Sequence, residues 1–320
     1  QPQEKSARMN SAASPIPVIV GPTACGKTRK GVALARLTGG EIVSADSRQV
    51  YRGMDVGTGK DLADYGPDVP YHLIDIADAG TKYNLFQYLR DCRAAVAGIK
   101  ARGKMPVMVG GTGLYVESFL KGIELPEVPE NTALRAELAG RPLEELAAML
   151  AGMKRLHNTT DIDTTQRAIR AIEIETYYAE HPEAASKAKG AERPCAIVAG
   201  LDIGRDERRS MISARLRRRL EQEDMTGEVE RLLAEGVDPE TLIYYGLEYK
   251  YLTMYVLGRI TRAEMERDLE IAIHQFAKRQ MTWWRGMEKR GFPIHWFPYD
   301  MPDAEFASAV AELIAAYGRG

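Results

Sequence analysis

The residues best suited to chemistry begin at VIVGPTACGKTRK, residues 18–30, which contains the spacing G-x-x-x-x-G-K-T. An apolar run precedes this segment and a helical pattern follows it, as a phosphate-binding loop requires. Backbone N–H groups and the positive end of the helix would bind a diphosphate, Lys27 would neutralise its oxygens, and Thr28 would ligate Mg²⁺. We interpret Cys25 as a small loop side chain rather than a reactive thiol. The predicted diphosphate-binding residues are Gly21, Pro22, Thr23, Ala24, Cys25, Gly26, Lys27 and Thr28.

A second candidate segment is EIVSADSRQVY, residues 41–51, where a short strand pattern ends at polar side chains. Because sites of open parallel sheets lie at the carboxyl ends of the strands, Asp46, Ser47 and Gln49 should lie near the phosphate loop. A carboxylate beside a diphosphate suits a base that deprotonates an acceptor, and an amide can bind a nucleobase edge through two hydrogen bonds. The alternative interpretation, less favoured on these residues alone, is that Asp46 caps a helix or belongs to the shell of a metal.

The loop pattern is typical of nucleotide-binding and ATP-binding P-loop proteins, so it does not identify the ligand. A nucleoside triphosphatase would also need an apolar strand that ends in an aspartate holding the metal's water shell. The strand pattern at residues 105–111 ends in glycines, and the one at 71–76 places Asp75 inside the strand. Neither fits, which counts against a small-molecule kinase or ATPase.

Basic residues gather on three helical patterns. In TTQRAIRAIE, residues 164–173, spacings of three and four let two of the polar side chains share a helix face. In FAKRQMTWWRGMEKR, residues 276–290, cations alternate with two tryptophans, a combination suited to phosphates and stacked bases. The arginines of SARLRRRLEQE would equally form an ordinary exposed helix face; they are Arg215, Arg217, Arg218 and Arg219.

Length and composition limit the classes of protein to which the chain can belong. The chain of 320 residues is 45% hydrophobic, which can fill a sizeable core, and its net charge of −2 means that any basic surface must be local. Three widely separated cysteines indicate neither a zinc site nor a disulfide framework. No apolar run reaches the length of a membrane span, and residues 1–14 lack the apolar core of a signal peptide. We therefore expect a cytoplasmic protein that does not bind membranes.

Short β-branched runs alternate with helical patterns, which predicts an α/β fold: a P-loop-type parallel sheet flanked by helices, with a small helical insertion domain. A crossover helix is expected over residues 84–101, capped by Asn84. Residues 1–14 should form a mobile tail and 126–163 the insertion, while 15–125 and 164–320 form the catalytic core. The expected strands are 16–20, 41–46, 71–76, 105–111, 195–203 and 294–297.

Six motifs, in order and spacing, resemble the tRNA dimethylallyltransferases over residues 16–297: GPTACGKT, SADSRQVYRGMDVGTGK, YHLIDI, VGGTGLY, QRAIRAIEI and AKRQMTWWR. The resemblance implies transfer of a dimethylallyl group from dimethylallyl diphosphate to the exocyclic amine of an adenine next to the anticodon of tRNA, with Mg²⁺. The phosphate loop would then hold a prenyl diphosphate. The adenine would be read in an unpaired anticodon loop and extruded into the pocket. We expect a monomer whose insertion contacts RNA.

The resemblance also assigns roles. Asp46 is implied as the base that accepts the proton of the amine, and Thr23 and Lys27 as donors that stabilise the departing diphosphate. The residues implied in binding tRNA are Asp46, Ser47, Arg48, Gln49, Thr112, Gln166, Arg167, Arg170, Lys278, Arg279 and Arg285.

The chain departs from the family pattern in places, and two alternative functions remain open from the sequence. The family commonly continues as GTAKP where this chain has GTGKD, residues 57–61, and an arginine of the family falls on Tyr245, for which Lys250 is the candidate replacement. A related enzyme that prenylates free AMP would share the chemistry, although the basic helices favour RNA. An RNA-binding protein with a vestigial loop is disfavoured by the intact Lys27, Thr28 and Asp46.

Overall fold

The computed structural model describes residues 14–125, 127–153, 162, 164–187 and 192–317. The predicted mobile tail therefore lies outside the described residues, apart from Ser14. By compactness the chain divides into two units, one of residues 1–122 and 193–320 and the other of residues 123–192. No helix in the described ranges has both the length and the apolar composition to cross a membrane.

The larger unit is built on one sheet of six parallel strands in the order β3-β2-β4-β1-β5-β6, which confirms the predicted fold class. Strand β3 is shorter than predicted, because Leu73 and Asp75 adopt positive φ angles of 67° and 57° that extended strands exclude. Strands β1 and β2 both pair with β4, so the ends of these three strands meet at one edge. The strands are β1 Ile16–Val20, β2 Glu41–Ser44, β3 Tyr71–His72, β4 Pro106–Val109, β5 Ala196–Asp202 and β6 Ile294–Pro298.

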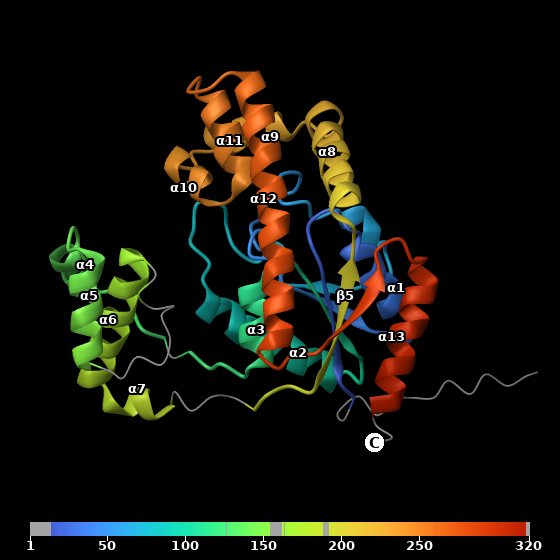
Figure 1. Cartoon of the computed structure of the whole chain (residues 1–320), viewed down its shortest axis with the longest axis horizontal. Helices are drawn as coiled ribbons and strands as arrows, with labels where there is room; N and C mark the ends of the chain where they lie inside the picture. The colour runs from blue at the N-terminus through green and yellow to red at the C-terminus, as the bar shows by residue number, and fades with distance from the viewer. Residues whose placement is uncertain (1–13, 126, 154–161, 163, 188–191, 318–320) are drawn as a thin grey trace, which may run out of the picture. The chain divides into compact units, whose positions relative to one another are not determined.

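Helices surround this sheet and extend beyond its carboxyl edge (Figure 1). The crossover helix α2 starts as predicted, with a capping box in which Asn84 accepts from the N–H of Gln87 and the Gln87 side chain accepts from the N–H of Asn84. The helices of this unit are α1 Lys27–Thr38, the 3₁₀ helix η1 Leu62–Tyr65, α2 Leu85–Ala101, α3 Gly113–Leu120, α8 Arg205–Glu221, α9 Met225–Ala234, α10 Pro239–Tyr244, α11 Leu247–Val256, α12 Arg262–Lys289 and α13 Asp303–Tyr317.

Two apolar clusters fix the larger unit. One packs α1 and α13 against the sheet, with Ile19, Leu34 and Phe306 completely or almost completely buried. The other packs α8, α9, α11 and α12 together around residues such as Leu232 and Tyr249. The long helix α12 belongs to this cluster and also runs down beside α3 (Figure 1). It therefore links the helical cluster to the edge of the sheet where the candidate site lies.

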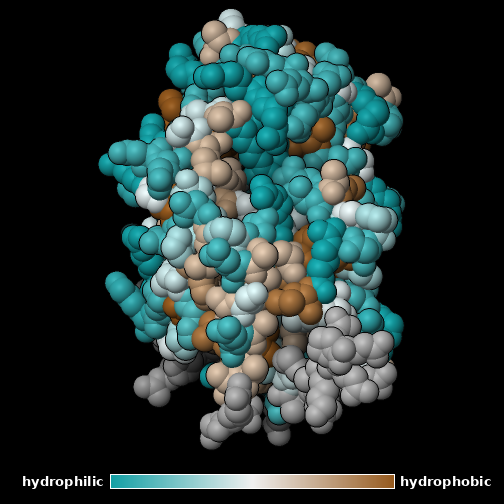
Figure 2. Space-filling model, turned by 90° about the vertical axis from the view of Figure 1, so that its right-hand side faces the viewer, coloured by the Kyte–Doolittle hydropathy of each residue, from teal (hydrophilic) through white to brown (hydrophobic). Residues whose placement is uncertain are grey.

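The face that carries α1, α8 and α13 is mixed in polarity. Figure 2 shows mostly hydrophilic side chains over its upper half, whereas apolar ones gather over its lower half. Helix α13 supplies much of the apolar character, since its sequence DAEFASAVAELIAAY is rich in alanine.

The smaller unit consists of α4 Thr132–Leu138, α5 Leu143–Met153, α6 Thr165–Glu180 and α7 Pro182–Lys187. It has its own apolar core, in which Leu146 and Leu150 of α5 meet Ala168 and Ile172 of α6. The prediction that the insertion ends at residue 163 is therefore wrong. Helix α6 does not belong to the catalytic core, because its apolar stripe packs on α5, and the unit extends to residue 192.

Candidate active site

The phosphate-binding loop lies between β1 and α1 in the conformation that its glycines permit. Gly26 precedes α1 with a φ of 83°, in the left-handed region where glycine is favoured, and Ala24 also has a positive φ of 64°. Lys27 Nζ donates to the carbonyl of Pro22 at 2.6 Å, so the ammonium lies folded back over the loop. The buried Cys25 thiol donates to the same carbonyl at 2.9 Å, so it is packed within the loop.

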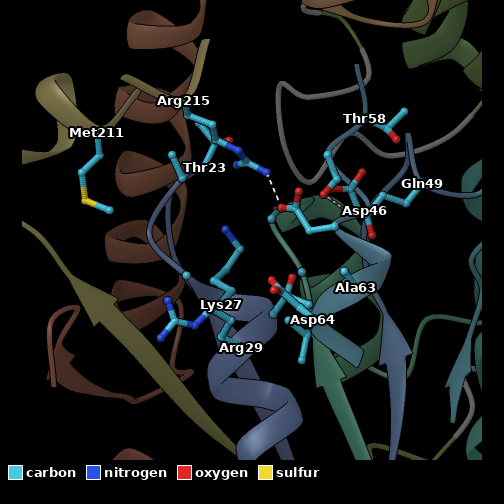
Figure 3. A pocket seen from close by; sticks show the side chains of 18 of the residues that line it. Thr23, Lys27, Arg29, Asp46, Gln49, Thr58, Ala63, Asp64, Met211 and Arg215 are labelled. Carbon is cyan, nitrogen blue, oxygen red and sulfur yellow. Dashed lines mark hydrogen bonds and ion pairs between the residues drawn. The ribbon is translucent and has the colours of Figure 1, made fainter. Parts of the chain in front are cut away.

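A cavity of about 700 Å³ opens at the carboxyl edge of the sheet, above this loop. Lys27 and Thr28 line it from the start of α1, and Asp46 and Gln49 line it from the segment after β2. Figure 3 shows Lys27 on one side of this space and Asp46 with Gln49 on the other, with Arg215 reaching in from α8. The structure thus brings the two segments singled out in the sequence into one cavity.

Asp46 lies just before the turn of residues 47–50, and no helix starts there. One carboxylate oxygen, Oδ1, accepts from the backbone N–H of Arg48 at 2.8 Å, which orients the side chain and leaves Oδ2 outside this turn. The helix-cap alternative for Asp46 is therefore excluded. Beside it, the backbone N–H of Ser47 donates to Thr112 Oγ1 at 3.0 Å, so Thr112 of the loop between β4 and α3 holds the segment after β2.

Gln49 lines the cavity with its amide already engaged. Its Oε1 accepts from Ser44 Oγ at 3.3 Å, and its Nε2 donates to the carbonyl of Gly59 at 3.2 Å. Both distances are at the long end of the range for hydrogen bonds. The amide is thus oriented by weak bonds, and Oε1 and Nε2 each retain capacity for a further hydrogen bond to a ligand.

Two arginines of α8 lie against the phosphate loop, which corrects the expectation of an ordinary exposed helix face. Arg219 is only 6% exposed, and together with Thr23 and Ala24 it lines a small cavity of about 20 Å³. Its Nε and Nη2 have no hydrogen-bond partner within the part of the chain that the structure describes. Arg215 lines both cavities and pairs with Asp61 at 2.7 Å.

The departure from the family pattern at residues 57–61 is explained by these arginines. A Cβ atom on Gly59 would lie 2.2 Å from Nη2 of Arg219 and 2.6 Å from Nη2 of Arg215, so a larger residue would require both guanidinium groups to move, and the φ of 63° at this position also favours glycine. Asp61 then supplies the carboxylate that pairs with Arg215 and lies 3.8 Å from Arg219. Gly59 and Asp61 were the sequence signals that could have pointed to the arginine pair.

Burial shifts the pKa values of two charged groups at the two cavities. Burial, followed by the neighbouring Arg215, lowers the pKa of Arg219 to about 10, which still leaves it a cation at neutral pH. Burial, followed by the nearby Asp61, raises the pKa of Asp64, a carboxyl on the cavity wall. A buried cation, with the carboxylates of Asp61 and Glu248 among its neighbours, therefore lies next to the phosphate loop.

Thr28, Asp46 and Asp64 present oxygen atoms to the cavity, and oxygen is the ligand type that Mg²⁺ prefers. Among the described residues there is no group of three or more His, Cys, Asp or Glu side chains placed to hold a metal. Mg²⁺ would therefore fit only with phosphate oxygens and water completing its coordination, as is usual for this ion.

Tyr245 and Lys250 lie outside the cavity. Tyr245 is fully buried, its ring lies 4.3 Å from that of Tyr51, and its hydroxyl accepts from the N–H of Gly80 at 2.7 Å. Lys250 is exposed, with Nζ 5.3 Å from the ring centre of Tyr251. The suggestion that Lys250 replaces a missing arginine is therefore wrong. The arginines that line the two cavities are Arg215, Arg218 and Arg219 of α8 and Arg29 of α1.

Lys278, Arg279 and Arg285 are exposed on α12, where Trp283 is 37% exposed and Trp284 is fully buried. The charge of Arg285 acts on Arg208 at the start of α8. Burial, followed by the charge of Arg285, lowers the pKa of Arg208 there. This end of α12 therefore carries clustered positive charge beside one exposed aromatic ring.

The predicted RNA-binding residues of α6 lie in the smaller unit. Gln166 and Arg167 are exposed on its first turn. Arg170 is engaged within the unit, since it forms an ion pair with Glu173 and donates to the carbonyl of Val128 at 2.9 Å. At least part of the role of Arg170 is thus to hold this unit together.

Comparisons with known proteins agree with these features. The family model described as IPP transferase matches residues 49–287, and one described as isopentenyl transferase matches residues 14–65. The chain is 56% identical over 302 residues to tRNA dimethylallyltransferase 2 of Bacteroides fragilis, covering 93% of this chain and 97% of that protein. It is 54% identical over 305 residues to tRNA dimethylallyltransferase 1 of Porphyromonas gingivalis, covering 94% and 99%.

The chain is also similar to solved structures of transferases that act on tRNA or are named for it. A tRNA isopentenylpyrophosphate transferase from Bacillus halodurans matches with a TM-score of 0.69 and 29% identity, covering 96% of this chain and 98% of that one. A eukaryotic dimethylallyltransferase acting on tRNA matches with a TM-score of 0.77 at 19% identity, covering 95% of this chain and 80% of that one, which supports the fold alone.

Proposed function

The chain belongs to the IPP transferase family and is a prenyltransferase, and we propose that its cavity transfers a dimethylallyl group from dimethylallyl diphosphate to the exocyclic amine of the adenine next to the anticodon of tRNA. One observation carries the proposal. The phosphate loop, the carboxylate of Asp46 and the arginine pair of α8 all line the same cavity or the small one beside it. A donor diphosphate and an acceptor amine can therefore meet there.

On the donor side, the bond from the allylic carbon to oxygen breaks, and its electron pair leaves with the diphosphate. Lys27, the loop N–H groups and the two arginines are placed to stabilise that charge as it develops. Mg²⁺ bound near Thr28 would add positive charge at the same oxygens. Arg219 is the strongest candidate among the arginines, because its Nε and Nη2 have no hydrogen-bond partner among the described residues and its side chain lines the small cavity together with Thr23 and Ala24.

On the acceptor side, the amine nitrogen forms the new bond to carbon and gives up a proton. Adenine's amine is a weak nucleophile because its lone pair is delocalised into the ring, so a base that accepts the proton helps the reaction. Asp46 fits this role, since one of its oxygens is fixed by the turn at Arg48 while the side chain faces the cavity. The adenine must leave its stack to reach the carboxylate.

The proposal is tested by offering labelled dimethylallyl diphosphate together with either tRNA or AMP. Label in tRNA, at the adenine beside the anticodon, supports the proposed acceptor. Label only in AMP would instead identify an enzyme that prenylates a free nucleotide. Incorporation of label from ATP but not from the prenyl donor would contradict prenyl transfer altogether.

We expect Gln49→Leu to slow transfer by roughly ten- to a hundred-fold, because it removes an amide that can both donate to and accept from the adenine, at a cost of about 1–3 kcal/mol. The affinity for the donor should stay unchanged, since Gln49 lies across the cavity from Lys27 (Figure 3). Initial rates on an anticodon stem-loop, at saturating donor, measure the effect. A wild-type rate in the variant would show that other groups read the base.

For the basic end of α12, Arg279→Ala or Arg285→Ala should weaken the binding of different tRNAs alike and flatten the salt dependence. Each lost phosphate contact should reduce the slope of log affinity against log salt by about 0.9 or somewhat less. Arg262→Ala, at the exposed opposite end of the same helix, is the control. An unchanged slope for the first two variants would assign these arginines to structure instead of RNA binding.

A further inference from the structure

Gln280 of α12 bridges two loops of the site with one amide. It is only 8% exposed, its Oε1 accepts from the backbone N–H of Thr23 at 2.8 Å, and its Nε2 donates to the carbonyl of Gly111 at 3.0 Å. Thr23 belongs to the phosphate loop, and Gly111 belongs to the loop between β4 and α3. The amide oxygen and the amide nitrogen of Gln280 thus each bind a backbone group, and the two backbone groups belong to different loops at the sheet edge.

The loop between β4 and α3 is shaped to receive α12. A Cβ atom on Gly111 would lie 2.6 Å from Nε2 of Gln280, and one on Gly113 would lie 2.3 Å from Cδ1 of Trp283. The residue between these glycines, Thr112, accepts from the N–H of Ser47. Hydrogen bonds therefore connect Gln280, through this loop, to Ser47, the residue that follows Asp46.

We propose that Gln280 is a positioning residue that sets the distance between the donor-binding and acceptor-binding parts of the cavity. The inference rests on the proposed function, in which the diphosphate lies on the phosphate loop and the amine lies at Asp46. A bond-forming step is sensitive to such spacing, since a displacement of about 1 Å can cost roughly 10²-fold in rate. Gln280 also occupies the N–H of Thr23, so the later N–H groups of the loop are left for the diphosphate.

The test compares Gln280→Leu, which keeps the bulk but loses both hydrogen bonds, with Gln275→Leu at an exposed position of the same helix. With saturating donor and anticodon stem-loop, kcat of Gln280→Leu should fall roughly 10²-fold. The KM for the donor should change much less, and Gln275→Leu should match wild type. Circular dichroism and melting confirm that each variant is folded.

A second variant separates hydrogen bonding from general damage. In Gln280→Glu, a protonated carboxyl can still donate to Gly111 and accept from Thr23, whereas the ionised form cannot donate. Burial raises the pKa of such a carboxyl. The rate of this variant relative to wild type should therefore rise as the pH is lowered, while the relative rate of Gln280→Leu stays flat.

Hydrogen exchange gives a readout that does not depend on activity. The amide of Thr23 should be protected in the wild type and exchange faster in Gln280→Leu. A folded Gln280→Leu protein with the wild-type kcat, a loss confined to the donor KM, or unchanged exchange at Thr23 would each overturn the inference. Wild-type protein that transfers no prenyl group to RNA would contradict the proposed function instead, while the exchange experiment would still decide the role of Gln280.

Discussion

Replacing Asp46 with alanine should slow dimethylallyl transfer by roughly 10²- to 10⁴-fold, the usual effect of losing a general base. The carboxylate faces the cavity and is oriented by the N–H of Arg48, on the acceptor side. Donor binding should therefore remain close to that of the wild type. Single-turnover rates with preformed enzyme–RNA complex, together with calorimetric titration of the donor, measure the two quantities separately.

Asp46→Asn is the matched control for geometry. An asparagine side chain can still accept from the N–H of Arg48, but it cannot take a proton from the amine. It should therefore be about as slow as the alanine variant. If donor affinity collapses in both variants while the chemical step is little changed, Asp46 serves the metal and not the acceptor.

Arg219→Ala should weaken binding of dimethylallyl diphosphate by roughly 30- to 700-fold, which corresponds to about 2–4 kcal/mol for a buried charge that loses its partner. Nε and Nη2 of the guanidinium have no hydrogen-bond partner within the described part of the chain, and the side chain lines a small cavity together with Thr23 and Ala24, so a diphosphate on the phosphate loop would supply acceptors for it. Donor titration by calorimetry measures the loss.

Arg217→Ala, two residues earlier on the same helix but exposed, is the control and should bind the donor as the wild type does. Anticodon stem-loop binding should be unaffected in Arg219→Ala, because Arg219 is almost completely buried. Equal donor affinities in the two variants would show that Arg219 only stabilises the helical cluster.

The parts of the fold that depend on local pattern could be predicted from the sequence. Apolar β-branched runs bounded by glycine and proline mark β1, β2, β4 and β5, and the spacing of the phosphate loop fixes its place between β1 and α1. Asn84 marks the start of α2, because its side chain caps the first turn of the helix together with Gln87. These features arise from residues close together in the chain.

What could not be predicted depends on tertiary packing. The spacing of Arg219 from Ile212 and Leu216 places it on the buried face of α8, but only the folded chain brings it beside Gly59 and the cavity at Thr23. Gln280 looks like one polar residue among several on α12, and only the folded chain brings it to Thr23 and Gly111. The boundary of the smaller unit was missed because a helical pattern does not reveal which core the helix joins.

The central claim is that one cavity holds a prenyl diphosphate on the phosphate loop and an extruded adenine at Asp46. The most direct measurement follows label from dimethylallyl diphosphate into two anticodon stem-loops, one with adenine at the target position and one with inosine, which lacks the amine. We expect wild-type enzyme to label only the adenine stem-loop, and Asp46→Asn to bind the donor but leave both unlabelled. Label in the inosine stem-loop, or rapid labelling by Asp46→Asn, would contradict the account.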